Sequence, residues 1–246
     1  MTPARTVDSP PRRAAWTLLG GYAMAVGAVV AYTALVLSPV TATTVLSAVL
    51  GHFTAALAGA VCLGGLVLVL ITTQPDEGGV LDPSAFRAHL MVERAALLWF
   101  GAAVVMVGVQ AATDAGVSVT RMLTEGGLGA GIGASETARA WIVVAIAAAI
   151  IAVFSRLTVR WEWHVPLLIP AVVGVVAVPV TGGAGEGPDH DYATSAVIVF
   201  AIAVSVWAGL RVVAAVAPPD TATHGRVPVA GLAAGAVALL YGIGLI

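Results

Sequence analysis

The chain has 246 residues, of which 59% are hydrophobic and 10% are charged, and its formal net charge is −2 at pH 7. Together with a mean hydropathy of +1.00, this composition excludes an ordinary soluble domain and is typical of an integral membrane protein. The chain contains no lysine, and its arginines are spread along the sequence rather than clustered, so no nucleic-acid partner is expected.

Seven apolar segments are long enough to cross a bilayer as helices, which takes about 20 residues for a core of about 30 Å. They lie at about 16–37, 45–71, 93–112, 139–157, 163–180, 192–217 and 227–246. They show little alternation of polar and apolar residues, which makes a transmembrane barrel a poor alternative. We therefore predict an all-α, polytopic transmembrane helical bundle of about seven helices. It forms a single domain over 14–246 and follows a disordered cytoplasmic tail over 1–13.

The arginines also predict an orientation. With seven alternating helices, Arg121 and Arg139 fall on one side of the membrane and the other nine arginines fall on the opposite side. The positive-inside rule then places the N-terminus in the cytoplasm. The first segment could be taken for a signal peptide, but Trp16–Leu37 is longer than the usual apolar region of about 7–15 residues. We therefore interpret it as a spanning helix.

Two connections between the predicted helices are long. The inner one contains DPSAFRAH, in which Asp82 is placed as the N-cap of a helix and Pro83 as its first residue. The outer one, at about 113–138, contains GGLGAGIG. A nucleotide-binding loop would need a preceding strand, whereas both flanks here are membrane helices. We therefore expect a mobile, glycine-rich surface loop.

Two regions carry candidate metal ligands. His52 lies inside the second predicted helix, where a polar side chain is costly without a partner. It is either hydrogen-bonded to a carbonyl or hydroxyl of a neighbouring helix or it has a ligand or substrate role. The stretch TGGAGEGPDHDYATS precedes the sixth helix at the outer face and gathers Asp189, His190 and Asp191.

The aspartates of this stretch can cap the sixth helix. His190, between two carboxylates, is also a suitable ligand for copper or zinc, with the carboxylates orienting it. We find no catalytic motif of paired histidines, a nucleophile elbow or paired cysteines, so no enzyme activity is expected. Glu93 and Arg94 are interpreted as an interfacial ion pair at the cytoplasmic headgroups, with a role in proton movement as the alternative.

Several stretches resemble successive parts of one family. FTAALAGAVCLGGLVLVL, DPSAFRAHLMVERAALLWF and PDHDYATSAVIVFAIAVSVWAGL are similar to copper-resistance D (CopD) proteins. The closest likeness is to the N-terminal membrane half of bacterial fusions between copper-resistance D and a cytochrome c oxidase assembly factor. The resemblance covers about 45–217.

The resemblance implies a multi-pass protein of the bacterial inner (plasma) membrane that handles copper at the outer face. Copper would be taken up or delivered toward cytochrome oxidase. His190, with Asp189 and Asp191, would capture the ion, and His52 would receive it within the bundle.

The chain also departs from the family pattern. Gly183 and Phe200 stand where the family has histidines. This leaves a second hypothesis open, in which the chain is a CopD-like accessory or structural subunit that no longer binds metal. Its partners would then be the lipid bilayer and cytochrome oxidase or another membrane complex.

Overall fold

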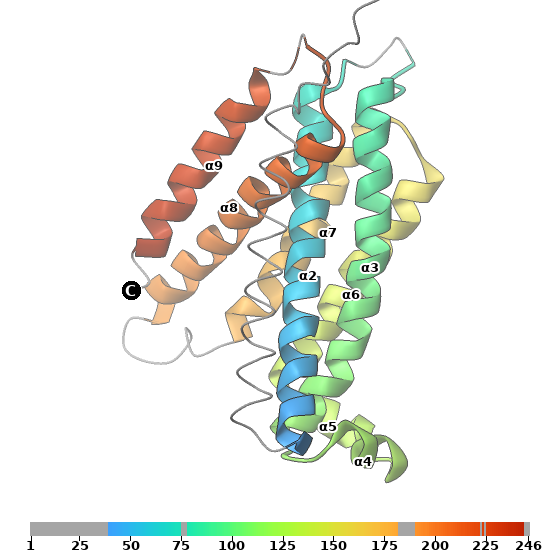
Figure 1. The fold of residues 1–246 in the computed structure, drawn as a ribbon, viewed down its shortest axis with the longest axis vertical. Coiled ribbons are helices and arrows are strands. Elements are labelled where there is room, and N and C mark those ends of the chain that lie inside the picture. Colours follow the sequence, from blue (N-terminus) through green and yellow to red (C-terminus); the bar gives the residue numbers. More distant parts are fainter. Residues whose placement is uncertain (1–38, 75–77, 182–189, 222, 224, 244–246) are drawn as a thin grey trace, which may run out of the picture.

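The computed structural model describes residues 39–74, 78–181, 190–221, 223 and 225–243, and within these ranges its named elements are all helices (Figure 1). The side chains of 39–44 and 190–192 are outside the description. The elements are α2 (Pro39–Thr72), α3 (Pro83–Asp114), α4 (Val119–Thr124), α5 (Leu128–Ala134), α6 (Glu136–Leu157), η1 (Trp161–Trp163), α7 (His164–Ala177), η2 (Pro179–Thr181), α8 (His190–Val216) and α9 (Arg226–Ile243). The prediction of an all-α bundle is confirmed.

Six helical segments of the described residues are long and apolar enough to span a membrane. They correspond to the second to seventh predicted segments, whereas the first, at 16–37, lies outside the described residues. Helices α2, α3, α6 and α7 pack together, α8 packs against α2 at a tilt, and α9 packs mainly against α8 (Figure 1). The protein is therefore a multi-pass membrane protein.

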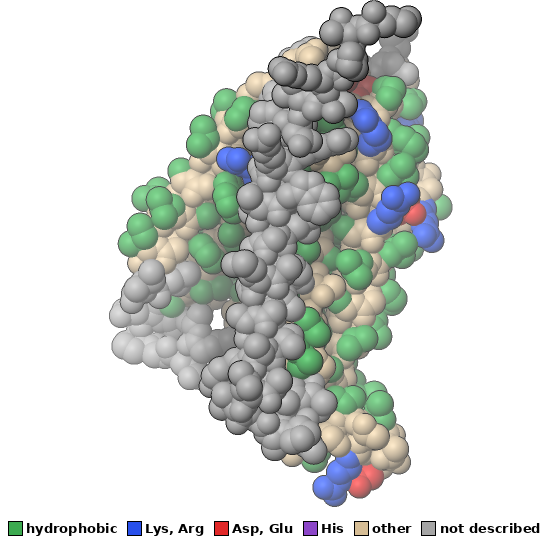
Figure 2. Space-filling view, in the orientation of Figure 1, with side chains coloured by type: hydrophobic (Ala, Val, Ile, Leu, Met, Phe, Trp, Pro, Cys, Tyr) green, Lys and Arg blue, Asp and Glu red, His purple; other side chains and the backbone are tan. Residues whose placement is uncertain are grey.

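Small side chains form much of the core, and large apolar side chains point outward. Ala96, Ala103 and Ala148 are fully buried, whereas Val105 and Ile169 are 60% and 69% exposed. Figure 2 shows apolar side chains along the flank of the bundle, with arginines in the upper part of the view and at the lower tip. This distribution suits a bundle whose outer surface contacts lipid rather than water.

Helices α2 and α8 approach each other closely where they cross. A Cβ atom placed on Gly209 would lie 1.8 Å from the carbonyl oxygen of Ala60, and one on Gly64 would lie 2.4 Å from the carbonyl carbon of Gly209. The two backbones touch here because neither glycine carries a side chain. This is the close approach that small residues permit between transmembrane helices.

Helix α3 begins well before its apolar segment. The hydropathy placed its start at about 93, but the helix begins at Pro83, and the predicted N-cap is confirmed. Asp82 accepts hydrogen bonds from the backbone N–H groups of Ser84 (2.9 Å) and Ala85 (3.0 Å) and from the Ser84 hydroxyl (2.6 Å). Partial burial raises the pKa of Asp82, but these hydrogen bonds and one from the Gln74 N–H outweigh it and leave the pKa below its usual value.

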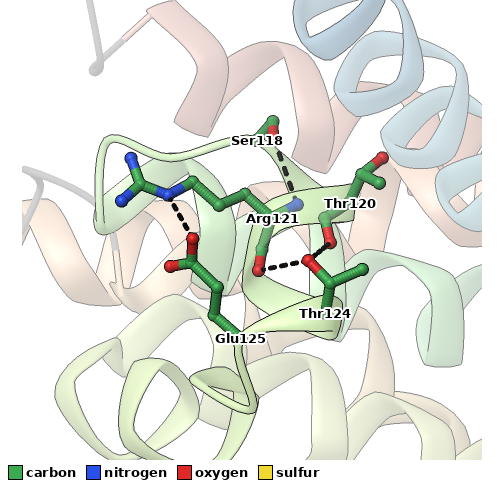
Figure 3. Close-up of polar contacts among 5 residues, drawn as sticks. All are labelled: Ser118, Thr120, Arg121, Thr124 and Glu125. Carbon is green, nitrogen blue, oxygen red and sulfur yellow. Dashed lines mark hydrogen bonds and ion pairs between the residues drawn. The ribbon is translucent and has the colours of Figure 1, made fainter.

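The outer connection between α3 and α6 is helical rather than an open loop. It contains α4 and α5, and α5 includes most of the glycine-rich stretch. Ser118 caps α4, and the exposed side chains of Arg121 and Glu125 form an ion pair of 2.9 Å (Figure 3). The packing of Met122 against Gly131 attaches α4 to α5. The predicted glycine-rich surface loop is therefore helical over Leu128–Ala134 rather than an open loop.

Candidate functional site

A cavity of about 510 Å³ lies between the helices, in the half of the bundle where α2 and α6 begin and α7 ends. Its walls come from α2, α3, α6, α7, η2 and α8 and are almost entirely apolar. The lining residues used below are His52, Gly59, Trp99, Trp141, Gly174, Val197 and Phe200. An internal cavity between helices of a bundle is a usual place for a ligand or ion site.

His52 is the titratable side chain in the lining of this cavity. Its Nδ1 lies 2.8 Å from the carbonyl oxygen of Ala48, one turn earlier on α2. A carbonyl only accepts, so Nδ1 carries the proton, and in the neutral ring Nε2 keeps a free lone pair. Metal-binding histidines usually have this arrangement, with the non-ligating nitrogen donating to a carbonyl.

The hydrogen bond of His52 also bears on the predicted alternatives. The sequence placed its partner on a neighbouring helix, but the partner is on α2 itself. The neighbouring helix α6 supplies an aromatic contact instead, because the rings of His52 and Trp141 meet edge to face with centroids 5.1 Å apart. The indole Nε1 of Trp141 is buried without a hydrogen-bond partner among the described residues. At this point the cavity lining therefore includes a residue, Trp141, whose indole N–H has no hydrogen-bond partner among the described residues.

Position 200 faces the same cavity as His52. Phe200 lies on α8 and lines the cavity from the side opposite α6. Its ring also packs against α9, since a Cβ atom on Gly242 would lie 3.0 Å from it. The structure thus brings His52 and Phe200 together in the lining of one cavity.

The indole of Trp99 forms the floor of the cavity, and glycines on two helices make room for it. A Cβ atom on Gly59 of α2 would lie 2.9 Å from the ring, and one on Gly174 of α7 would lie 2.6 Å from it. Trp99 is 2% exposed. The large ring therefore occupies the space between α2 and α7 at one wall of the cavity.

The remaining predicted ligands lie at the N-terminus of α8. His190 and Asp191 are the first two residues of that helix, but their side chains are outside the description, and Asp189 and Gly183 lie outside the described residues altogether. His190 precedes Val197 by seven residues, or about 10 Å along the helix. Within the described part of the chain, no group of three or more histidine, cysteine or acidic side chains could hold a metal ion.

A second polar cluster occupies the opposite half of the bundle, and the sequence did not predict it. Nδ1 of His89 on α3 lies 3.0 Å from Nε2 of His164 on α7, and Nε2 of His89 lies 2.8 Å from the carbonyl oxygen of Ser155 on α6. Nδ1 of His164 lies 3.2 Å from the carbonyl oxygens of Arg160 and Trp161. Both rings are almost fully buried, with exposures of 2% and 1%.

Contacts between two loops bring these histidines together. The backbone N–H of Trp161 donates to the carbonyl of Gly79 (2.9 Å), and that of Leu81 donates to the carbonyl of Val159 (3.3 Å). Gly79 has a φ of +73°, a conformation that suits glycine. These two backbone hydrogen bonds, called the loop clasp below, hold η1 beside the start of α3. His164 follows η1 directly.

An ion pair lies at the same end of the bundle. Arg156 Nε lies 2.7 Å from Glu93 Oε1, and the Glu93 side chain is only 20% exposed. Glu93 therefore pairs with Arg156 on α6. The sequence instead predicts an ion pair between Glu93 and Arg94.

The contact between His89 and His164 was not predicted because the two residues are separated by 75 positions in the sequence, so no local motif revealed it.

Similar proteins are known from mycobacteria. The chain is 50% identical over 192 residues to an uncharacterised protein of Mycobacterium bovis and to one of Mycobacterium tuberculosis, and 45% identical over 196 residues to one of Mycobacterium leprae. These alignments cover 78–80% of this chain but only 29% of each relative. The chain thus spans less than a third of the length of these relatives. The sequence matches no protein-family model and no solved structure.

Proposed function

We propose that this chain handles copper at the outer face of the bacterial inner membrane, as a CopD-like module for uptake or for delivery toward cytochrome oxidase. One observation carries the proposal. His52, with its Nδ1 held by a carbonyl, lines the same cavity as position 200, where the resemblance expects a second histidine. The proposal assigns no catalytic reaction to the chain.

His52 in the cavity lining and the nearby side chain of Met106 are of types that suit a copper ion in transit. Neutral imidazole is a good copper ligand, and a thioether is a soft ligand that favours Cu(I). The buried thioether of Met106 lies against the backbone at Gly51, since a Cβ atom there would be 2.1 Å from its sulfur, and Gly51 is adjacent to His52. In this proposal His190, Asp189 and Asp191 capture copper at the start of α8, and His52 then accepts it inside the cavity.

Copper stoichiometry of the purified protein in detergent tests this proposal. Wild type loaded with copper and then desalted should retain a single ion per chain, and His52→Ala and His190→Ala should each lose it. The variant Phe200→His should bind copper more tightly than wild type, because it adds an imidazole that faces the cavity of His52. Phe200→Leu is the matched control and should behave as wild type.

The gain-of-binding variant makes the experiment decisive. If neither wild type nor Phe200→His retains copper while both remain folded, the cavity is not a copper site and the proposal fails. If wild type binds copper that His52→Ala still retains, the ion is held elsewhere and the assignment of His52 is wrong.

A second function is favoured by the same cavity. Its described lining offers one imidazole and a phenylalanine at position 200, which is a weak ligand set for a metal. We propose, as the alternative, an accessory or structural subunit packed against cytochrome oxidase or another membrane complex. Co-purification with an intact oxidase in mild detergent, together with normal copper-dependent growth of a deletion strain, would support it over copper handling.

A further inference from the structure

The His89–His164 pair requires more protons than two neutral rings possess. Three contacts run in a row, from the Ser155 carbonyl to His89, from His89 to His164, and from His164 to the carbonyls of Arg160 and Trp161. Carbonyl oxygens only accept hydrogen bonds, so each of the three contacts needs one N–H group. Two neutral imidazoles carry only two such protons.

The consequence can be followed atom by atom. If both outer nitrogens donate to their carbonyls, then His89 Nδ1 and His164 Nε2 are two bare lone pairs that face each other at 3.0 Å. If instead His164 Nε2 donates to His89, then His164 Nδ1 is bare and faces two carbonyl oxygens at 3.2 Å. Each neutral arrangement leaves one repulsive contact between acceptors, and a single added proton removes it.

We propose that His89 and His164 form a binding site for one shared proton. The proton lies between His89 Nδ1 and His164 Nε2, and the two outer N–H groups donate to the backbone. A second proton is excluded, because both facing nitrogens would then carry hydrogens directed at each other across 3.0 Å. The site is separate from the cavity of His52, since neither His89 nor His164 lines that cavity.

Burial opposes a positive charge at this place and is the largest influence on both rings, whereas the nearby carboxylate of Glu93 favours the charge. On α3, Glu93 follows His89 by one turn and interacts with it electrostatically. The other charged side chains near this end of the described helices include Arg87 and Arg94 on α3, Arg156 on α6, and Arg160 and Glu162 beside η1. Arg156 forms an ion pair with Glu93, and Arg160 forms one with Glu162. On α2, the titratable group of the inner half is the buried thiol of Cys62, whose Sγ lies 3.7 Å from the Val92 carbonyl.

Two further polar atoms of the same cluster are unused. The hydroxyl of Ser155 and the indole Nε1 of Trp161 are buried without a hydrogen-bond partner among the described residues. Both belong to residues whose carbonyls face the histidines. Buried polar groups are rarely left without a hydrogen-bond partner. The cluster therefore contains two unused polar groups in addition to the contacts made by the two histidines.

Uptake of the proton completes a chain of hydrogen bonds that joins three helices. It runs from α6 through His89 on α3 to His164 on α7 and ends on the carbonyls of Arg160 and Trp161 at the start of η1. Protonation therefore tightens the contacts between α3, α6 and α7 at this end of the bundle, and loss of the proton weakens one of them.

Ring-nitrogen NMR of the full chain, labelled with 15N-histidine and held in detergent or nanodiscs, tests the site. Between about pH 4 and pH 8, the signals of both rings should change together in one transition that adds a single proton to the pair. In His89→Gln the transition of His164 should move, because its partner is gone. In His52→Gln, the matched control in the other half of the bundle, it should be unchanged.

Two results would overturn the proposal. One is a pair of independent transitions, with His164 titrating in the same way in wild type and in His89→Gln. The other is that both rings keep neutral signals over the whole range while the protein remains folded. If His89→Gln does not fold, the wild-type spectra decide alone, since one joint transition supports the site, and two transitions or none reject it.

Discussion

Replacement of Gly209 by alanine should force α2 and α8 apart. The new Cβ atom would lie 1.8 Å from the Ala60 carbonyl oxygen, whereas carbon and oxygen atoms in contact are separated by about 3.5 Å. The obstacle is helix backbone, which has no rotamer by which to move aside. The helices must therefore separate or slide by about 1.5 Å, and the contacts around the crossing are lost.

The magnitude follows from two opposing effects. Alanine is favoured over glycine inside a helix by about 1 kcal/mol, but overpacking of a tight contact costs about 1–3 kcal/mol, and more where backbones collide. Because the clash here involves the backbones of two helices, we expect a net loss of about 2 kcal/mol. For a chain of this size that lowers the melting temperature by about 4–8 °C.

Thermal unfolding in detergent, followed by circular dichroism or by the loss of the monodisperse peak, measures this effect. Gly101→Ala on α3 is the matched control, since a Cβ atom there meets nothing within 4 Å, and it should melt at or slightly above the wild-type temperature. If Gly209→Ala melts with the control, α2 and α8 do not touch at this crossing and the packing argument is refuted.

Two further predictions concern the ends of the helices. Asp82→Ala should lower the free energy of unfolding by about 1 kcal/mol, because it removes the N-cap of α3. Since hydrogen bonding lowers the pKa of Asp82 below its ordinary 3.8, this contribution is complete above that value and is lost as the pH falls through the lowered pKa. Melting of wild type and variant should therefore converge as the pH falls below 3.8, and a constant difference would contradict the assignment. Glu125→Gln should change stability by less than about 0.5 kcal/mol in the same melts, because its ion pair with Arg121 is 61–64% exposed; a loss above about 1 kcal/mol would show a structural role for that pair.

Sequence reasoning found the features that depend on neighbouring residues. Length and hydropathy located six spans that the structure describes, and the Asp82–Pro83 pair revealed where α3 begins, although the apolar segment starts ten residues later. These signals are local, because a span needs a continuous apolar run and a cap needs its own first turn.

The candidate sites depend on features that a single sequence carries weakly. The helices are apolar on all sides, so periodicity does not tell which face is buried, and it could not show that Phe200 and His52 share a cavity. The contact between His89 and His164 depends on the loop clasp at Gly79, which joins residues far apart in the chain. No pattern in the sequence around either histidine indicates that the two touch.

The angle at which α2 and α8 cross near Gly209 also determines how far the cavity wall at Phe200 lies from α2. Phe200 is nine residues away on α8, or about 13 Å along the helix axis. A change of about 5° in the crossing angle would therefore displace the wall at Phe200 by about 1 Å, with α9 carried along by its packing on α8. The width of the space in front of His52 is thus set by an angle at a distant contact between two glycines.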